Sequence, residues 1–365
     1  MGTTSIDSIL HEERLFPPPD DFIAGANIND PAQLQKMYDE AERDHAGFWG
    51  HHARQEISWQ REFTTTLDES KAPFYQWFPD GILNVSYNCL DRHLAQRGDK
   101  TAIVFEGEPG DVRHISYTEL HRETCRFANA LKRHGIAKGD RVILYMPMVP
   151  EAVIAMQACA RIGAIHSVVF GGFSAEALKD RIDDAGAKLL ITADGGHRGG
   201  KIVELKAAAD KALTHCHSAL ETVIVLKRTG HEVPMAAGRD IWWEDALAEA
   251  EEQCEPEWVD AEHPLFILYT SGSTGKPKGI QHSSAGYLLG AITTMKWVFD
   301  SHEADVFWCT ADVGWVTGHT YVAYGPLAVG STILMYEGAP TVPDAGRFWK
   351  LCQDHQVTVF YTAPT

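Results

Sequence analysis

The sequence predicts an α/β protein built of mostly parallel sheets flanked by helices. From about residue 100 onward, short apolar runs typical of buried strands alternate with stretches whose apolar spacing is that of amphipathic helices. Glycines follow three of these helical stretches, at Gly135, Gly163 and Gly186, and indicate where each helix ends. Strands separated by helices are joined by right-handed crossovers, which produce a parallel sheet.

Residues 1–95 have a different character, because they are rich in aromatic and charged side chains and show no strand alternation. The pair Asp30-Pro31 predicts an N-cap and the first residue of a helix over 31–54. Trp49, Trp59 and Trp77 fit packing onto a following domain better than a partner site. We interpret this region as an N-terminal extension wrapped on the core.

The α/β elements follow in order. Ser116 to Glu119 form a capping box, which predicts the start of a helix that runs to His134. Residues 229–260 are interpreted as a surface excursion with Trp242-Trp243 and an acidic helix. Predicted strands lie at 101–105, 141–145, 166–170, 188–192, 222–226, 265–269, 305–310, 332–336 and 357–361, and further predicted helices at 151–162 and 174–185. We therefore expect an extension at 1–95, a first α/β subdomain at 96–260, and the start of a second at 261–365.

Composition limits the possible functions. With 365 residues and 44% hydrophobic residues, the chain can bury a sizeable core. Its 50 Asp and Glu against 32 Lys and Arg give a net charge of −18, which argues against general binding to nucleic acid or to an anionic membrane. No apolar run reaches the roughly 18 residues of a membrane span, so we expect a cytoplasmic protein. The 7 scattered cysteines fit free thiols, and no spacing predicts a metal ligand set.

The stretch from Leu265 to Gly279 predicts a phosphate-binding loop, because an apolar strand passes abruptly into hydroxyl, glycine and lysine residues. It is not the common P-loop, since Gly272 and Gly275 are only three residues apart and Pro277 follows Lys276. Pro277 favours an extended Lys276, so the chain is expected to continue as a turn or hairpin. The predicted ligand is a nucleoside triphosphate.

Two other loops follow predicted strands, where ligands of parallel sheets bind. In the first, Phe170 is followed by Gly171 and Gly172 and then by a helix start at Ser174, a turn that receives a phosphate or lets a backbone pass. In the second, residues 194–201, four glycines surround Arg198 and Lys201 and predict a flexible cationic loop. A plain turn before a helix explains either loop equally well.

Residues 311–320 follow another predicted strand and carry the residues of a small pocket wall. Trp315 would limit the depth of the pocket, Thr317 would offer one polar contact, and Gly318 would permit close approach. A core turn is the alternative interpretation.

Together these stretches resemble the adenylate-forming enzymes, a family that includes acyl-CoA synthetases, luciferases and peptide synthetase adenylation domains. The segment from Tyr269 to Gly279 is similar to the signature loop of that family. The acetyl-CoA synthetase branch is indicated by the segments Trp77-Phe78, Asn84 to His93, Phe170 to Ser174, Gly314 to His319 and Phe360 to Thr365. The resemblance covers essentially the whole chain.

The resemblance implies a ligase that first forms acetyl-adenylate from acetate and ATP and then transfers the acetyl group to coenzyme A, with Mg²⁺ offsetting phosphate charge. It implies an acyl pocket wall of Trp315, Val316 and Thr317. It implies that the triphosphate is held by Thr270, Ser271, Gly272, Ser273, Thr274, Gly275, Lys276 and Lys278. Coenzyme A contacts are implied at Gly171, Arg198, Gly199, Gly200, Lys201, Thr317 and Thr341.

The sequence also departs from the family pattern. Thr341 stands where the family usually has asparagine, and Lys201 stands where some relatives have arginine. Family members continue past Thr365 into a domain that bears the catalytic lysine, so no catalytic residue is predicted here, and these 365 residues alone are expected not to form acetyl-adenylate. The alternatives are a propionyl-CoA synthetase and a non-catalytic module that binds a nucleotide or coenzyme A.

Overall fold

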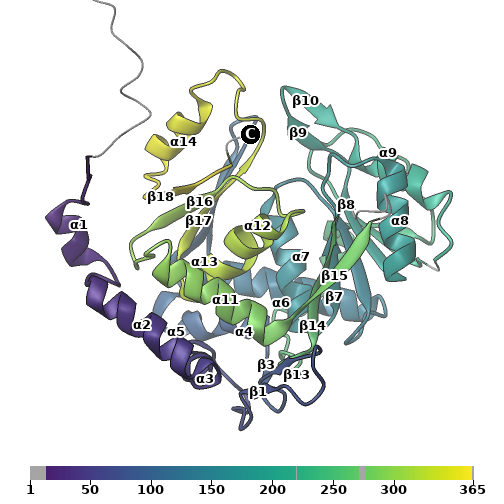
Figure 1. The fold of residues 1–365 in the computed structure, drawn as a ribbon. Coiled ribbons are helices and arrows are strands. Elements are labelled where there is room, and N and C mark those ends of the chain that lie inside the picture. The colour runs from purple at the N-terminus through teal and green to yellow at the C-terminus, as the bar shows by residue number, and fades with distance from the viewer. Residues whose placement is uncertain (1–13, 219, 271–276, 364–365) are drawn as a thin grey trace, which may run out of the picture.

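The computed structural model describes residues 14–218, 220–270 and 277–363, and all structural statements below concern these residues. Two sheets dominate it (Figure 1). The seven-stranded sheet has the order β12-β11-β8-β6-β7-β14-β15 and the five-stranded sheet the order β18-β16-β17-β4-β5. The first consists of β6 (Arg141–Tyr145), β7 (Ile165–Val168), β8 (Leu189–Ala193), β11 (Thr222–Leu226), β12 (Asp240–Trp242), β14 (Pro264–Thr270) and β15 (Lys278–Ser283); the second of β4 (Thr101–Gly107), β5 (Val112–Ser116), β16 (Val306–Cys309), β17 (Thr332–Glu337) and β18 (Val359–Tyr361).

Both sheets are parallel except at one edge, which confirms the predicted fold class. In the first sheet only β15 is antiparallel, and it pairs with β14 from Thr270↔Lys278 to Pro264↔Ser283, so the predicted hairpin is present. In the second sheet only β5 is antiparallel, and it pairs with β4. The five-stranded sheet therefore combines residues 101–116 with residues 306–361, and the two sheets are interleaved along the chain.

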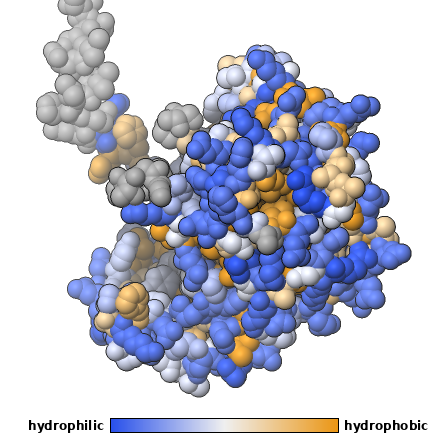
Figure 2. All heavy atoms as spheres, turned by 90° about the vertical axis from the view of Figure 1, so that its right-hand side faces the viewer, coloured by the Kyte–Doolittle hydropathy of each residue, from blue (hydrophilic) through white to orange (hydrophobic). Residues whose placement is uncertain are grey.

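Helices cover both faces of each sheet (Figure 1). On the outer face of the seven-stranded sheet lie α8 (Ala175–Ala185) and α9 (Leu205–Leu213), and between the sheets lie α6 (Tyr117–Arg133), α7 (Pro150–Arg161), α11 (Ser284–Trp297) and α13 (Gly325–Val329). On the outer face of the five-stranded sheet, α14 (Arg347–Asp354) buries Leu351 against Trp308 and Leu334. Seen from the side of α8 and α9, the surface is mostly hydrophilic, with a hydrophobic area near the centre of the view (Figure 2).

Local sequence explains where the helices begin and end. Ser116 and Glu119 form the predicted capping box of α6, and Gly186 ends α8 in the left-handed conformation at φ 57°. The shorter elements are α4 (Val85–Cys89), α5 (Leu94–Arg97), α10 (Trp243–Leu247), α12 (Val316–Gly318), a 3₁₀ turn at Asp91–His93, a π-helical turn at His319–Tyr324, and the strands β1 (Leu67–Asp68), β2 (Gln76–Trp77), β3 (Ile82–Leu83), β9 (Gly196–Arg198), β10 (Lys201–Val203) and β13 (Val259–Asp260).

The N-terminal region forms three helices, and its tryptophans pack on the core. The predicted single helix over 31–54 is wrong, because α2 (Pro31–Arg43) and α3 (His45–Glu56) are separated at Asp44, whose side chain accepts the Gly47 N–H at 2.8 Å and caps α3. A short α1 (Asp20–Gly25) precedes them. Trp49 stacks on Trp297 of α11 at a centroid distance of 6.3 Å, and Trp59 and Trp77 pack on the core, as predicted.

The surface excursion predicted for 229–260 is wrong in part. Residues 240–242 form β12, which pairs in parallel with β11 at the edge of the seven-stranded sheet. Trp243 is buried and stacks on Phe127 of α6 at 3.8 Å. The stacking of Trp243 on Phe127 holds this segment to the core. This packing could not be predicted from sequence, because Trp242 and Trp243 lie in an acidic stretch that looks like exposed surface.

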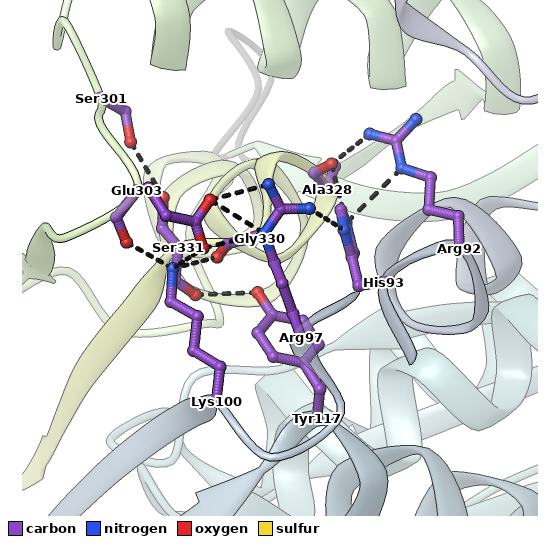
Figure 3. Close-up of polar contacts among 10 residues, drawn as sticks. All are labelled: Arg92, His93, Arg97, Lys100, Tyr117, Ser301, Glu303, Ala328, Gly330 and Ser331. Atoms are coloured by element: carbon purple, nitrogen blue, oxygen red, sulfur yellow. Dashed lines mark hydrogen bonds and ion pairs between the residues drawn. The ribbon is translucent and has the colours of Figure 1, made fainter. Parts of the chain in front are cut away.

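A polar cluster, called here the amino-end cluster, closes the five-stranded sheet at the amino ends of β4, β16 and β17 (Figure 3). Its members are Arg92, His93, Arg97, Lys100, Tyr117, Ser301, Glu303, Ala328, Gly330 and Ser331. Lys100 Nζ donates to Glu303 Oε1 at 2.9 Å and to the Gly330 carbonyl at 2.7 Å, while Arg92 donates to the carbonyl of Ala328. The cations thus cap the carboxyl end of α13, where the helix dipole is negative.

Each of the 7 cysteines is free, as predicted. No described helix is long and apolar enough to cross a membrane.

Candidate active site

A cavity of about 670 Å³ opens where the carboxyl ends of the two sheets face each other. Its walls come from the segments that follow β6, β7, β16, β17 and β18 and from the β9–β10 hairpin. This is the edge at which parallel α/β sheets bind ligands, because the loops there are free to carry binding residues while the strands hold them in place. The volume is that of a small-molecule site.

Four of the residues predicted to bind ligands line this cavity. They are Gly171 after β7, Arg198 at the end of β9, and Trp315 and Thr317 in the segment after β16. These residues come from three loops that are far apart in the sequence. The structure therefore brings together the first strand-end loop, the cationic loop and the predicted pocket wall.

The pocket wall is held by close backbone packing around Gly314 and Gly318. A Cβ on Gly318 would lie 2.0 Å from the Asp312 carbonyl oxygen, and one on Gly314 would lie 2.8 Å from Cα of Phe170. Trp315 meets Phe170 and Phe173 at centroid distances of 5.8 and 5.9 Å. These contacts fix the indole at the cavity while leaving it 48% exposed.

Val316 is placed differently from its predicted neighbours. It is the first residue of α12, is 50% exposed, and does not line the cavity. Of the three residues predicted as the acyl wall, Trp315 and Thr317 therefore face the cavity in the described chain and Val316 does not.

Asp312 is a cavity-lining carboxylate that sequence reasoning did not single out. Its Oδ1 accepts the Gly314 N–H at 2.7 Å and so shapes the turn before Trp315. Burial raises the pKa of Asp312 to about 6, against the opposing effects of the Gly314 amide and the nearby Arg198. The charge on this wall is therefore sensitive to pH close to neutrality.

The cationic loop is an ordered β-hairpin. Arg198 pairs with Lys201, and Gly199 and Gly200 form its two-residue turn with φ of 66° and 70°. Glycine adopts two successive positive φ values without strain, whereas most other residues do not. The side chains of Arg198 and Lys201 have no hydrogen-bond or ion-pair partner within the described part of the chain.

Three carboxylates accept hydrogen bonds from the backbone of the hairpin, and none of the three was predicted from the sequence. Glu108 accepts N–H groups from Gly199 and Gly200, and Glu337 accepts the N–H of His197 at 3.0 Å. Asp194 accepts from the Gly195 amide at 2.7 Å, at the base of the hairpin. The available signal was position, since Glu108 and Glu337 stand at the carboxyl ends of β4 and β17.

Arg228 connects these carboxylates. It donates to Glu337 Oε2 at 2.6 Å and to Asp111 Oδ2 at 2.8 Å, so it joins the loop after β11 to the turn between β4 and β5. Burial raises the pKa of Glu337, although hydrogen bonds from Arg228 and His197 oppose the shift. The network ties the seven-stranded sheet to the five-stranded sheet at the cavity rim.

The remaining predicted positions lie at or beyond the edge. Thr270 and Lys278 are the exposed ends of β14 and β15, at the same carboxyl edge. Thr341 is exposed and does not line the cavity, although its neighbour Pro340 does. Ser271, Gly272, Ser273, Thr274, Gly275 and Lys276 lie outside the described residues.

Within residues 14–218, 220–270 and 277–363, no three His, Cys, Asp or Glu side chains are grouped as metal ligands. A hard cation prefers several oxygen ligands.

The chain belongs to the family of AMP-binding enzymes, whose family model matches residues 90–365. A second model, described as the N-terminus of acetyl-coenzyme A synthetase, matches residues 34–89. The junction falls in α4, between the N-terminal helices and β4.

Among curated proteins, the chain is similar to the acetyl-coenzyme A synthetases of Methylobacillus flagellatus, at 62% identity over 364 residues, and of Nitrosomonas europaea, at 60% over 362 residues. The acetyl-coenzyme A synthetase of Thiobacillus denitrificans is 62% identical over 363 residues. These alignments cover 99% of this chain but only 56%, 55% and 55% of the relatives. The chain thus spans about half the length of the curated relatives it matches.

Proposed function

We propose that the complete gene product is an AMP-forming acetate–CoA ligase. The observation that carries the proposal is the convergence of Gly171, Arg198, Trp315 and Thr317 on one cavity at the carboxyl edge. The names of the relatives, which are acetyl-coenzyme A synthetases at 60% and 62% identity, support the same activity.

In the proposed first step, an acetate oxygen attacks the α-phosphorus of ATP and the bond to the β-phosphate breaks, so that acetyl-adenylate forms and pyrophosphate leaves. The carboxylate has then gained a good leaving group. Thr270 and Lys278 flank the segment proposed to hold the departing phosphates, and Mg²⁺ would arrive with the nucleotide. Trp315 closes the end of the acyl site, while Thr317 supplies its polar contact.

In the proposed second step, the sulfur of coenzyme A attacks the acetyl carbonyl carbon, the bond to the AMP oxygen breaks so that AMP leaves, and the thiol proton passes to water. Coenzyme A would enter past Gly171, where the lack of a side chain leaves room, and its 3′-phosphate would lie on Arg198 and Lys201. The unpaired state of these two cations supports that role, because a free cation can form charge-assisted hydrogen bonds with a phosphate. Since ATP and coenzyme A are cytoplasmic, we propose the same compartment for the protein.

The test uses the complete gene product in two assays. Acetate-dependent exchange of labelled pyrophosphate into ATP reports the first step, and formation of AMP and acetyl-CoA on addition of coenzyme A reports the second. Both activities are expected. Exchange with propionate that exceeds exchange with acetate would assign the propionyl enzyme instead, and binding of ATP and coenzyme A without either reaction would indicate a non-catalytic module.

A further inference from the structure

The carboxylate of Glu108, in the turn between β4 and β5, binds three backbone N–H groups that come from distant parts of the chain. Oε1 accepts from Gly200 at 2.6 Å, and Oε2 accepts from Gly199 at 2.9 Å and from Ala339 at 2.8 Å. Burial acts to raise the pKa of this carboxyl, but the three amides outweigh it and hold the pKa below its usual range. Glu108 is therefore ionised at neutral pH.

The two glycine amides are those of the hairpin turn itself. They lie between Arg198 and Lys201, which are directly paired across the hairpin. A pair of successive N–H groups in a turn with positive φ forms a concave anion site. In this structure the occupant of that site is the Glu108 carboxylate, so the amides are not left to water.

This contact fixes the hairpin relative to the other sheet. β9 and β10 pair only with each other, so the tip of the hairpin has no sheet neighbour. Its other attachment to the five-stranded sheet is the bond from the His197 amide to Glu337 at 3.0 Å. Glu337 therefore holds the start of the hairpin and Glu108 holds its tip.

The position of Arg198 and Lys201 thus depends on Glu108. With the turn amides occupied, an incoming phosphate is left to the two cationic side chains, which have no hydrogen-bond or ion-pair partner in the described chain. Holding their backbone in place lowers the ordering cost of binding, since less of the loop must be immobilised when the ligand arrives.

We propose that Glu108 is a positioning residue for the 3′-phosphate of coenzyme A. It locks the Gly199–Gly200 turn so that Arg198 and Lys201 face that phosphate together. This inference rests on the proposed function, and it adds a residue that acts through the hairpin rather than by touching the ligand.

The test compares Glu108→Gln with the wild type in the complete gene product. The neutral amide replaces one acceptor oxygen by an N–H₂ group that faces the turn amides, so the turn is released. The KM for coenzyme A is expected to rise about 10-fold, the equivalent of one charge-assisted hydrogen bond. The KM for 3′-dephospho-coenzyme A, which lacks the phosphate, is expected to stay within about twofold, because Arg198 and Lys201, the side chains that Glu108 positions, are proposed to bind that phosphate.

Glu119→Gln is the matched control. Glu119 also accepts a backbone N–H, from Ser116 at 2.8 Å, and it lies at the opposite end of the β4–β5 pair. It should leave the KM of both ligands unchanged. If Glu108→Gln does not fold, Glu108→Asp retains the charge and withdraws it by one methylene, and a smaller rise of about threefold, again confined to coenzyme A, is expected.

Equal increases in KM for the two ligands, or no increase for either, in the variant that folds would overturn the inference. A wild-type protein that forms no acetyl-CoA contradicts the proposed function instead. The two failures are therefore distinguishable in the same set of assays.

Discussion

At the amino ends of β4, β16 and β17, each cation of the amino-end cluster has a partner, whereas at the carboxyl ends of the same sheets Arg198 and Lys201 have none within the described residues. In the first region the cations bind carbonyl groups and Glu303 (Figure 3). In the second region Glu108 and Glu337 bind backbone amides of the hairpin and Arg228 pairs with Glu337, while Arg198 and Lys201 have no hydrogen-bond or ion-pair partner among the described residues. The comparison indicates that the amino-end cluster stabilises the fold, and it supports the proposal that the carboxyl edge receives an anion.

The first prediction concerns a variant that disturbs the close packing of the pocket wall, and it has the largest expected effect. Gly318→Ala places a methyl group against the Asp312 carbonyl. Overpacking of this kind costs about 1–3 kcal/mol of folding free energy. The resulting shift of Trp315 and Thr317 should lower kcat/KM for acetate on the order of 100-fold.

Gly290→Ala, in the interior of α11, is the control for this variant, because its methyl group meets nothing within 4 Å. It should raise the free energy of unfolding by about 0.5–1 kcal/mol and leave kcat/KM for acetate unchanged. Thermal unfolding and steady-state kinetics of both variants check the pair, and a Gly318→Ala protein with normal acetate kinetics would contradict our description of the wall.

The second prediction tests the free cations. Removing either Arg198 or Lys201 by substitution with alanine should raise the KM for coenzyme A about 10- to 100-fold, the value of one or two charge-assisted hydrogen bonds. The free energy of unfolding should change little, since neither side chain has a hydrogen bond or an ion pair to lose within the described residues. Denaturant unfolding alongside coenzyme A titration separates the two effects.

The third prediction removes a cation of the amino-end cluster, and here we expect a loss of stability without a change in ligand binding. Lys100→Ala removes donors to Glu303 and to the Gly330 carbonyl and should lower the free energy of unfolding by about 1–2 kcal/mol. The KM values for acetate, ATP and coenzyme A should not change. An altered KM for coenzyme A in this variant would break the distinction between the two edges.

The fourth prediction uses pH and has the smallest expected effect. Hydrogen bonds from Arg97, with Lys100, lower the pKa of Glu303 from 4.5 to about 2, so the stability that its charge contributes is present above pH 4.5 and is lost as pH falls to about 2. The pKa of Asp312 is raised from 3.8 to about 6, so its ionisation costs stability that is absent below pH 3.8 and fully felt above about 6.

Two amide variants check these windows by thermal unfolding. Glu303→Gln should lower stability at pH 7 by less than about 1 kcal/mol, because the side chain is largely exposed and screened by solvent, and should have no effect near pH 2. Asp312→Asn should raise stability at pH 7 by about 1 kcal/mol and have no effect near pH 3. The same sign for both variants at pH 7 would contradict the assignment.

Local sequence patterns predicted most of the secondary structure. The capping box at Ser116 and Glu119 and the glycine after α8 are local signals, and each is confirmed. Asp44 was missed because the helical apolar pattern continues through it, although its side chain competes as a cap.

Long-range partners were not predictable. The pairing of β4 with β17 joins residues more than 200 positions apart, and an apolar run carries no record of its neighbour. Glu108 and Glu337 were missed for the same reason, because they bind backbone amides of a distant hairpin, and Glu337 also pairs with Arg228, 109 positions away. The division of the chain near residues 95 and 260 remains a prediction.

Hydrogen–deuterium exchange of the complete gene product, with and without saturating coenzyme A, tests the central claim most directly. We predict slower exchange at the β9–β10 hairpin and around Gly171 and Thr317, with no change in the segments of the amino-end cluster. Protection confined to the amino-end cluster, or unchanged exchange at the hairpin with coenzyme A bound, would contradict the assignment of the carboxyl edge as the binding edge.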